Sequence, residues 1–233
     1  TALVESRGEK EQYKSAEFRK MTLDDTVLFP QAMMPLFIFE PRYRLMLEEV
    51  LANDRIFAVA GLNREETSDN IDEPPHKIAG VGMVRACRKN SDGTSNLILQ
   101  GLARVECREI VSETPFRRVR IRALSSDQDG SEKNLAAMQP TLLGHLRTQI
   151  RLGAAIPDEV LQFLRQIEDP ENCLDLAIFT LCPSGSLKQE LLETRGILAR
   201  YEKFERFLRA QIEQIKLDKK LKGELDEDDL GQN

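Results

Sequence analysis

The pattern of apolar and polar residues changes once along the chain, close to residue 125. Before that point, apolar residues come in short runs that alternate with polar ones or are bounded by turn residues, which is typical of strands. After it, apolar residues recur three and four positions apart, as on one face of a helix. The two patterns predict an α+β fold, with a β-rich subdomain at residues 22–124 and a helical subdomain at residues 131–218.

The clearest predicted strand is at residues 116–124, where apolar and basic residues alternate strictly. Its apolar positions are Val119, Ile121 and Ala123, and its basic positions are Arg118, Arg120 and Arg122. Further strands are predicted at residues 57–60, 78–88, 96–100 and 102–111, with Asp92-Gly93 as a tight turn and Gly101 as a bend. Several short strands in succession, with turns between them, predict a small and partly closed barrel.

Residues 28–47 have the most unusual composition of the chain, because they hold three prolines and three phenylalanines. Proline donates no backbone hydrogen bond, so the apolar part of this segment is predicted to be an extended edge strand with bends. Pro41 suits the first turn of a helix. That helix would place Tyr43 and Leu47 on its apolar face.

The helical subdomain is predicted to hold five helices. Its predicted helices cover residues 135–150 and 158–167, then one from Pro170, one from Ser186 and a long last one at residues 197–215. Pro140 either kinks the first of these or marks its true start. Ser186 and Gln189 form a capping box for the fourth.

Three polar segments are predicted to lie outside the regular elements. Residues 1–21 are charged and weakly patterned, which indicates an N-terminal arm. Residues 63–77 are predicted to be a long polar loop, and loops of that length are often functional. Residues 219–233 are predicted to be an acidic disordered tail.

Composition excludes several classes of protein. A hydrophobic content of 41% and a charged content of 31% are those of an ordinary globular protein. The formal net charge of -6 argues against general nucleic-acid binding, and no apolar run reaches the ~20 residues of a membrane-spanning helix. Residues 1–20 lack the apolar core of an export signal. We therefore expect a cytoplasmic protein that binds no membrane.

The sequence offers no catalytic or metal-binding constellation. The four cysteines have no C-x-x-C spacing, and the two histidines, His76 and His145, lie far apart, so a zinc site is not expected. There is no G-x-x-x-x-G-K-[ST] segment to hold nucleotide phosphates. Ser186 lies near Lys188, but this serine is predicted to cap a helix. We expect reduced and buried cysteines, no cofactor, no metal and no enzymatic activity.

Three stretches carry a resemblance to a known family. They are LFIFEPRY at Leu36–Tyr43, then Ile78–Gly82 with the Asp92-Gly93 turn, and Gly101–Val105 with Glu109 and Thr114-Pro-Phe116. With these motifs, and with the helical pattern that follows, residues 24–216 resemble the amino-terminal domain of Lon proteases. The resemblance implies a PUA-like β-rich pseudo-barrel followed by an α-helical bundle.

The same resemblance implies a role in recognising protein substrates. Full-length Lon enzymes add an ATPase module and a Ser-Lys peptidase module, and neither is present in these 233 residues. We therefore expect a stand-alone, non-catalytic member whose partners are unfolded or tagged polypeptides, a protease or another regulatory protein. The acidic stretch Glu224–Asp229 favours a natural end, and a fragment of a full protease stays an alternative.

A peptide-binding site is predicted at the edge strand and the long loop. Its residues are Met33, Met34, Phe37, Asn63 and His76. The two methionines are predicted to lie in a proline-bounded loop just before the strand, where flexible apolar side chains suit contacts with varied partners. An exposed sheet edge accepts extended peptides by strand addition. The alternative is that the methionines simply cap the barrel.

Two sets of charged residues complete the candidate chemistry. Glu40, Arg42, Tyr43 and Arg104 are part of the family pattern. They are predicted to form a structural ion-pair or hydrogen-bond set at the barrel mouth, with a direct ligand role as the alternative.

The stripe of Arg118, Arg120 and Arg122 is the second set. It is either a solvated strand face or a face for an anionic peptide or for RNA. RNA recognition needs exposed aromatic residues for stacking, and this stretch offers only Phe116. Nucleic acid is therefore not the favoured partner.

Overall fold

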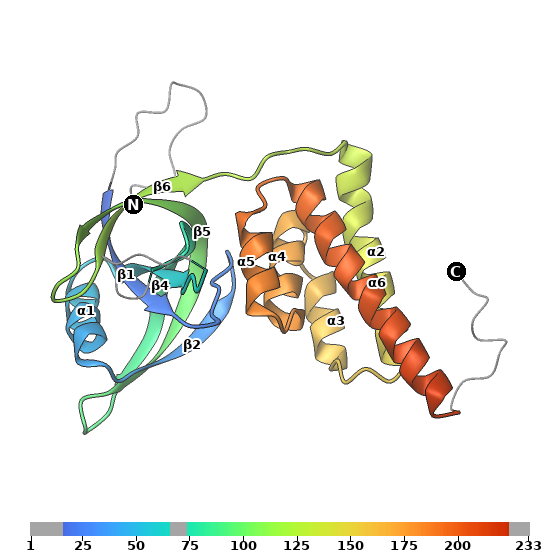
Figure 1. Ribbon diagram of the computed structural model, residues 1–233, viewed down its shortest axis with the longest axis horizontal. Coiled ribbons are helices and arrows are strands. Elements are labelled where there is room, and N and C mark those ends of the chain that lie inside the picture. Colours follow the sequence, from blue (N-terminus) through green and yellow to red (C-terminus); the bar gives the residue numbers. More distant parts are fainter. Residues whose placement is uncertain (1–15, 66–73, 224–233) are drawn as a thin grey trace.

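A computed structural model of the chain describes residues 16–65 and 74–223. Within this part, a six-stranded sheet with one helix lies beside a group of five helices (Figure 1). Strands fill most of the first half of the chain and helices fill the second, so the predicted α+β fold is confirmed. We call the two parts the barrel and the helical half.

The barrel is closed by a circuit of strand pairs. Its strands are β1 (Ala16–Leu23), β2 (Met33–Ile38), β3 (Ile56–Gly61), β4 (Ile78–Lys89), β5 (Ser95–Ser112) and β6 (Arg118–Leu124). Pairing runs from β1 to β3, β4, β5 and β6 and then back to β1, and only the β1–β3 pair among these is parallel. β5 is long enough to pair also with β2, which pairs with no other strand in the described residues. β2 is therefore an edge strand, as its prolines predict.

Strand β1 corrects the predicted arm at residues 1–21. Residues 16–21 belong to β1, which lies between β3 and β6 in the sheet. Lys20 and Thr22 are buried on either side of Met21, so polar residues occupy positions where a strand usually shows apolar ones. These polar residues hide the strand from sequence reasoning. Residues 1–15 lie outside the described part of the chain.

A connecting segment at residues 24–32 joins β1 to β2 and passes very close to β4 and β5. A Cβ atom at Gly80 would lie 2.2 Å from the carbonyl oxygen of Leu28, and one at Gly101 would lie 1.9 Å from that of Phe29. Only glycine permits this approach. β5 runs through Gly101 without a break, contrary to the predicted bend, so Gly101 serves close packing rather than chain reversal.

The connecting segment also links two hydrophobic cores. Leu28 is fully buried in the barrel core together with Met46 and Phe57. Its neighbours Val27 and Phe29 belong to the core of the helical half. Successive residues of an extended segment face opposite ways, so one short stretch enters both cores and holds the two parts together. Burying one side chain of this size contributes about 1.5–3 kcal/mol.

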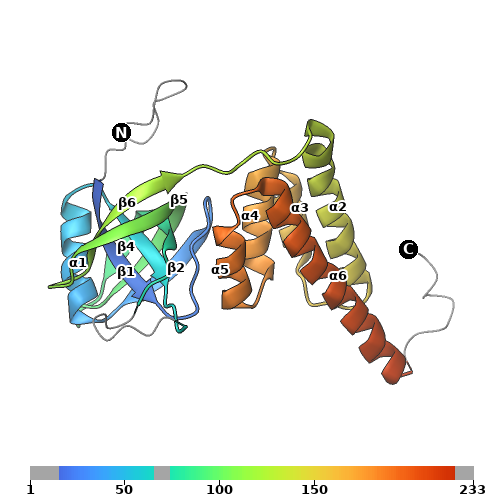
Figure 2. The same ribbon diagram turned by 45° about the horizontal axis from the view of Figure 1, so that its top comes forward.

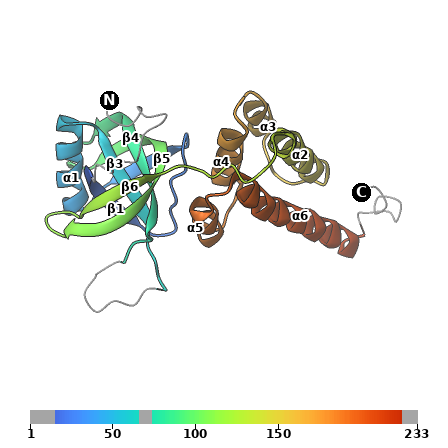
Figure 3. The same cartoon turned by 90° about the horizontal axis from the view of Figure 1, so that it is seen from above.

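Helix α1 (Pro41–Ala52) covers the side of the barrel that faces away from the helical half (Figures 1 and 3). Pro41 occupies the first turn, as predicted, because a missing backbone N–H has no consequence there. Tyr43 and Leu47 are buried on the predicted apolar face, and Met46 joins them. The helix therefore closes the outer end of the barrel core.

The helical half consists of α2 (Glu132–Arg151), α3 (Asp158–Arg165), α4 (Pro170–Leu181), α5 (Gly185–Glu193) and α6 (Ile197–Leu221). Pro140 lies inside α2, whose cap is Ser131, so this helix begins before the proline. Ser184, rather than the predicted Ser186, caps α5 by accepting a hydrogen bond from the Leu187 amide at 3.2 Å. The helix therefore begins two residues earlier than predicted.

Helix α6 is the longest of the described helices and extends beyond its neighbours (Figure 2). Its last residue is Leu221, so the predicted disordered tail at residues 219–233 is wrong for residues 219–221. Residues 224–233 lie outside the described part of the chain. None of the helices that the structure describes combines the length and the apolar character needed to cross a membrane.

Candidate functional site

Strand β2 presents a row of exposed apolar side chains at the edge of the barrel. Met33 is 49% exposed and Phe37 is 54% exposed, and Pro35 between them is exposed as well. Phe39, just past the strand, is 59% exposed, and its ring stacks on that of Phe37 with 5.9 Å between ring centroids. Contiguous apolar side chains at a surface are a feature of interaction sites.

Met34 is a correction to the predicted peptide-binding set. Both methionines lie within β2 rather than in a loop before it. Successive residues of a strand face opposite ways, so Met33 lies at the surface while Met34 is 5% exposed and belongs to the barrel core. Met34 therefore offers no surface to a partner. The alternative of a barrel-capping role fits Met34 and not Met33.

A groove of about 390 Å³ lies beside this row, on β2, β4 and β5. Strand pairing sets Phe37 of β2 next to Asn96 of β5, and Asn96 next to Arg88 of β4. Directly paired residues lie on the same face of a sheet. We call the outward residues of these strands the β2 face, which consists of Met33, Pro35, Phe37, Ala86, Arg88, Asn96 and Ile98.

A second groove, of about 720 Å³, lies where the barrel meets α5. Asn63 and His76, both predicted to bind peptide, line this groove and not the one beside β2. Its lining holds a single arginine and five carboxylates, namely Arg64, Asp24, Asp25, Glu65, Glu190 and Glu193. We call it the acidic groove. The two grooves share no lining residue, so the predicted site divides into an apolar part and an acidic part.

Internal contacts in the acidic groove connect α5 to the barrel. The side-chain amide of Gln189 donates to the carbonyl oxygen of Ile78 at 3.0 Å and to Glu193 Oε1 at 2.8 Å. His76 Nδ1 lies 3.5 Å from the same Glu193 oxygen. These residues come from both parts of the molecule, so the groove contributes to the junction between them.

The predicted structural set divides in two. Arg42 Nε donates to Glu40 Oε2 at 2.9 Å, and its guanidinium carbon lies 4.6 Å from the centroid of the Tyr43 ring. The Tyr43 hydroxyl donates to the Thr22 carbonyl at 3.0 Å and accepts from the Thr22 amide at 3.2 Å, which ties α1 to β1. Arg104 is not part of this group, contrary to the prediction of one set at the barrel mouth.

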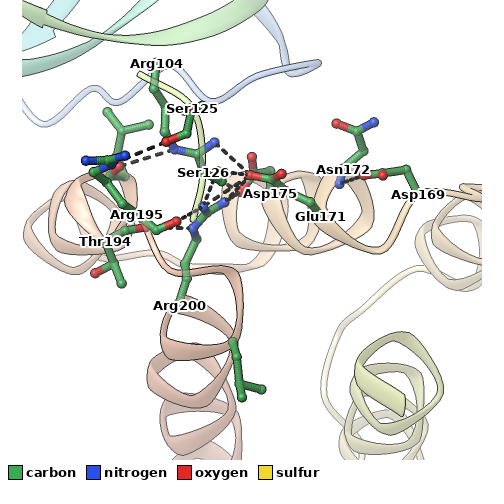
Figure 4. A network of polar contacts seen from close by, with 12 residues as sticks. Arg104, Ser125, Ser126, Asp169, Glu171, Asn172, Asp175, Thr194, Arg195 and Arg200 are labelled. Atoms are coloured by element: carbon green, nitrogen blue, oxygen red, sulfur yellow. Dashed lines mark hydrogen bonds and ion pairs between the residues drawn. The ribbon is translucent and has the colours of Figure 1, made fainter. Parts of the chain in front are cut away.

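Arg104 instead lies in a buried ion network at the junction between the two parts (Figure 4). Its Nη2 atom is 2.6 Å from Asp175 Oδ1 on α4, and Arg200 on α6 donates to the same oxygen at 2.6 Å. Glu171 lies 3.6 Å from Arg104 and 3.2 Å from Arg200. Arg104 also donates to the carbonyl oxygen of Leu192 on α5 at 3.3 Å. One barrel arginine thus contacts two helices, α4 and α5, and is linked to α6 through the Asp175 carboxylate.

Sequence reasoning missed Asp175 and Arg200, although both are almost fully buried. Asp175 stands between Leu174 and Leu176 on a helix with many apolar residues. A charge in such a position requires a partner when it is buried, which is the signal that could have found it. The identity of the partners depends on how the elements pack, so no spacing in the sequence reveals them.

The Arg118, Arg120 and Arg122 stripe on β6 is matched by carboxylates. Arg118 pairs with Glu49, Arg120 with Glu109 and Arg122 with Glu106. An anionic ligand on this face would have to displace three existing ion pairs. The alternative of an RNA-binding face is not supported.

Burial raises the thiol pKa of three cysteines, Cys107, Cys173 and Cys182. All four are free thiols, but Cys87 and Cys107 are only partly buried, so the prediction of buried thiols holds for Cys173 and Cys182. Burial raises the pKa of the Cys173 thiol to about 11 and also raises that of Cys107. A protonated thiol is a poor nucleophile and a poor metal ligand. In residues 16–65 and 74–223, no group of three or more His, Cys, Asp or Glu residues is placed to hold a metal.

Comparison with known proteins identifies the family. Residues 18–216 match the family described as the ATP-dependent protease La (LON) substrate-binding domain. The chain belongs to this family. Lon proteases of Desulfosudis oleivorans and Rhizobium meliloti are 25% and 28% identical to it, over 89% and 90% of the chain. The chain spans about a quarter of the length of these relatives, 26% in each case.

Solved structures of Lon domains share this fold. The N-terminal domain of Mycobacterium avium complex Lon protease superimposes with a TM-score of 0.63 at 14% identity, covering 85% of this chain and 98% of that domain. A Lon N-terminal domain protein from Xanthomonas campestris gives 0.56 at 16% identity, over 81% and 96% of the two chains. The resemblance to the Lon amino-terminal domain is therefore confirmed.

Proposed function

We propose that this Lon-family domain binds polypeptides with exposed apolar segments on its β2 face and performs no chemistry on them. The family description, a substrate-binding domain of a protease, supports a protein as the ligand. The observation that carries the proposal is the exposed row of Met33, Pro35 and Phe37 beside a groove of about 390 Å³. Folded proteins bury their apolar segments, so such a surface favours unfolded or tagged polypeptides.

Two physical effects would hold a peptide on this face. The free side of an edge strand offers backbone groups to an added strand, and those hydrogen bonds depend little on the peptide sequence. Pro35 donates none, which limits strand pairing and shifts the affinity toward side-chain contacts. A Phe or Met side chain that becomes fully buried contributes about 1.5–3 kcal/mol. Contacts of this kind tolerate many sequences, as selection among varied substrates requires.

The role of the domain in a whole protein would depend on the same β2 face. Next to an ATPase and a peptidase, the domain would bring substrates to the proteolytic machinery. Without those modules, it would bind polypeptides that a separate protease degrades, or it would bind a regulatory protein. The free thiols suit a reducing compartment, which is why we place this activity in the cytoplasm.

The direct test compares an unfolded protein with its folded form. Fluorescently labelled lactalbumin, reduced and carboxymethylated, is titrated with the domain alongside labelled native lactalbumin, and binding is followed by polarisation. We expect binding of the unfolded form alone. Met33→Asp and Phe37→Asp each lower the affinity about tenfold or more, because burial of such a side chain is worth at least one factor of ten.

Phe163→Asp is the matched control, because Phe163 is 50% exposed but lies on α3 in the helical half. This variant keeps the affinity of the unchanged domain. Equal binding of folded and unfolded lactalbumin would remove the proposal, and so would an equal loss in Phe163→Asp and Phe37→Asp. Thermal unfolding of each variant establishes that the fold is intact.

A further inference from the structure

Among the described residues, Arg88 of the β2 face and the nearby Arg85 have no carboxylate partner. The pairing of β4 with β5 shifts between Val84 and Ala86, so Arg85 and Ala86 are both exposed. Such β-bulges turn side chains toward the surface. The Arg85 Nε atom donates to the neutral side-chain oxygen of Gln100 at 2.6 Å. Within the described residues, neither Arg85 nor Arg88 has a carboxylate at ion-pair distance.

Most arginines of the barrel have a carboxylate partner; among the described residues Arg44 and Arg55 also have no ion pair, but neither of them lines the apolar groove. Arg42 pairs with Glu40, and each arginine of the β6 stripe pairs with a carboxylate of its own. The chain has more acidic than basic residues, 39 against 33, so carboxylates are abundant. A positive charge without a carboxylate, beside an apolar groove, offers a position for an anionic group of a ligand.

Strand register places this charge at a definite distance from the apolar row. Arg88 pairs with Asn96, and Asn96 pairs with Phe37. Neighbouring strands lie about 4.8 Å apart, so two strand spacings, roughly 10 Å, separate Arg88 from Phe37. An extended peptide covers that distance in about three residues. A short segment that crosses β5 in the groove, rather than one added along the free side of β2, can place an apolar side chain on Phe37 and a carboxylate on Arg88.

We propose that the β2 face prefers apolar segments that carry a carboxylate about three residues from the side chain that contacts Phe37. Arg88 binds the carboxylate, and Arg85 makes the electrostatic potential at that position more positive. The carboxylate comes from an Asp or Glu side chain or from a free carboxyl terminus. This inference rests on the proposed function and names the class of polypeptide that the same site takes. An exposed ion pair of this kind changes affinity about three- to fivefold and weakens as salt rises.

The test uses three short labelled peptides with the same apolar core. The first has both ends capped and two aspartates at one end, the second has asparagines in their place, and the third has asparagines and a free carboxyl terminus. In about 0.05 M salt we expect the aspartate peptide to bind about three- to fivefold more tightly than the asparagine peptide. The difference disappears in about 0.5 M salt.

Arg88→Gln removes this difference, because it lowers the affinity for the aspartate peptide much more than the affinity for the asparagine peptide. Arg120→Gln, which changes a surface arginine that has its own carboxylate, keeps the difference. Preferential binding of the third peptide over the second assigns the recognition to a free carboxyl terminus as well. Equal affinities for the first two peptides overturn the inference, as does an equal loss for both in Arg88→Gln.

The two proposals fail in different ways. If neither capped peptide binds, or if Phe37→Asp changes neither affinity, the β2 face is not the peptide site and both proposals fall. If both peptides bind in a manner that depends on Phe37 but not on their charge, the proposed function stands and only the carboxylate preference is lost.

Discussion

Arginine has two different roles on neighbouring strands of this barrel. On β5, Arg104 is 4% exposed and shares the Asp175 carboxylate with Arg200 at the junction of the two parts. On β6, the stripe that includes Arg120 also pairs with carboxylates, but these pairs remain in contact with water. Removing one partner of a hydrated pair leaves a charge that water stabilises, whereas removing one partner of a buried pair leaves a charge that nothing stabilises. Burial, and not the number of ion pairs, decides which charges the fold depends on.

The comparison is tested most strongly at Asp175. Asp175→Ala leaves the buried Arg104 and Arg200 without their shared carboxylate. We expect the free energy of unfolding to fall by about 3–5 kcal/mol, measured by urea denaturation. Asp127→Ala removes the partner of the exposed Arg195 and serves as the control, with an expected loss below about 1 kcal/mol. Similar losses in the two variants would contradict the distinction.

Lys20 sharpens the comparison, because it is a buried cation whose Nζ atom has no carboxylate at ion-pair distance among the described residues. It is 1% exposed, and the group that most favours its charged form is the Cys107 thiol rather than a carboxylate. Burial is the main cause that lowers the pKa of Lys20 from 10.5 to about 8. The folded state therefore binds this proton more weakly than the unfolded state does. The charge destabilises the fold below pH 8, and this penalty disappears as the pH rises from about 8 to 10.5.

Lys20→Met removes that penalty. We expect the free energy of unfolding at pH 7 to rise by about 3 kcal/mol, which corresponds to the shift in pKa at ~1.4 kcal/mol per unit. The gain over the unchanged protein shrinks between pH 8 and 10.5. Urea denaturation at a series of pH values measures both effects. A gain that stays constant over this range would show that Lys20 keeps its ordinary pKa of 10.5 in the folded protein, so that its burial carries no penalty.

The smallest effect is expected at the surface stripe. Arg120→Gln breaks the pair with Glu109, and both side chains are well exposed, at 42% and 57%. The free energy of unfolding should fall by about 0.2–1 kcal/mol and by less in high salt. Denaturation at low and high salt provides the measurement. A loss above about 2 kcal/mol would place Arg120 with the buried arginines.

Prediction from the sequence worked where a local pattern carries physical meaning. Pro35 indicates an edge strand, because proline has no backbone N–H to donate to a neighbouring strand. Pro41 marks the start of α1 for the same reason. Prediction failed at β1, where Lys20 and Thr22 are buried polar residues, and at Met34, whose orientation follows from a strand boundary that the pattern placed too late.

The candidate site shows the same division. Met33 and Phe37 were found from their apolar character beside prolines, and the structure places both on one surface. Asn63 and His76 were grouped with them, yet they line the acidic groove at the junction. Position along the chain does not tell which loops meet in space.

By itself, the sequence determined the fold class, the Lon family and the edge strand, because hydrophobic period and backbone hydrogen-bonding capacity are local properties. Only the tertiary structure decided which charges are paired. Arg104 meets Asp175 across 71 positions of the chain, whereas Arg88 meets no carboxylate in the described residues. A charge acquires its partner and its exposure to water from the packing of distant elements, and those two conditions decide whether it stabilises the fold or remains available to a ligand.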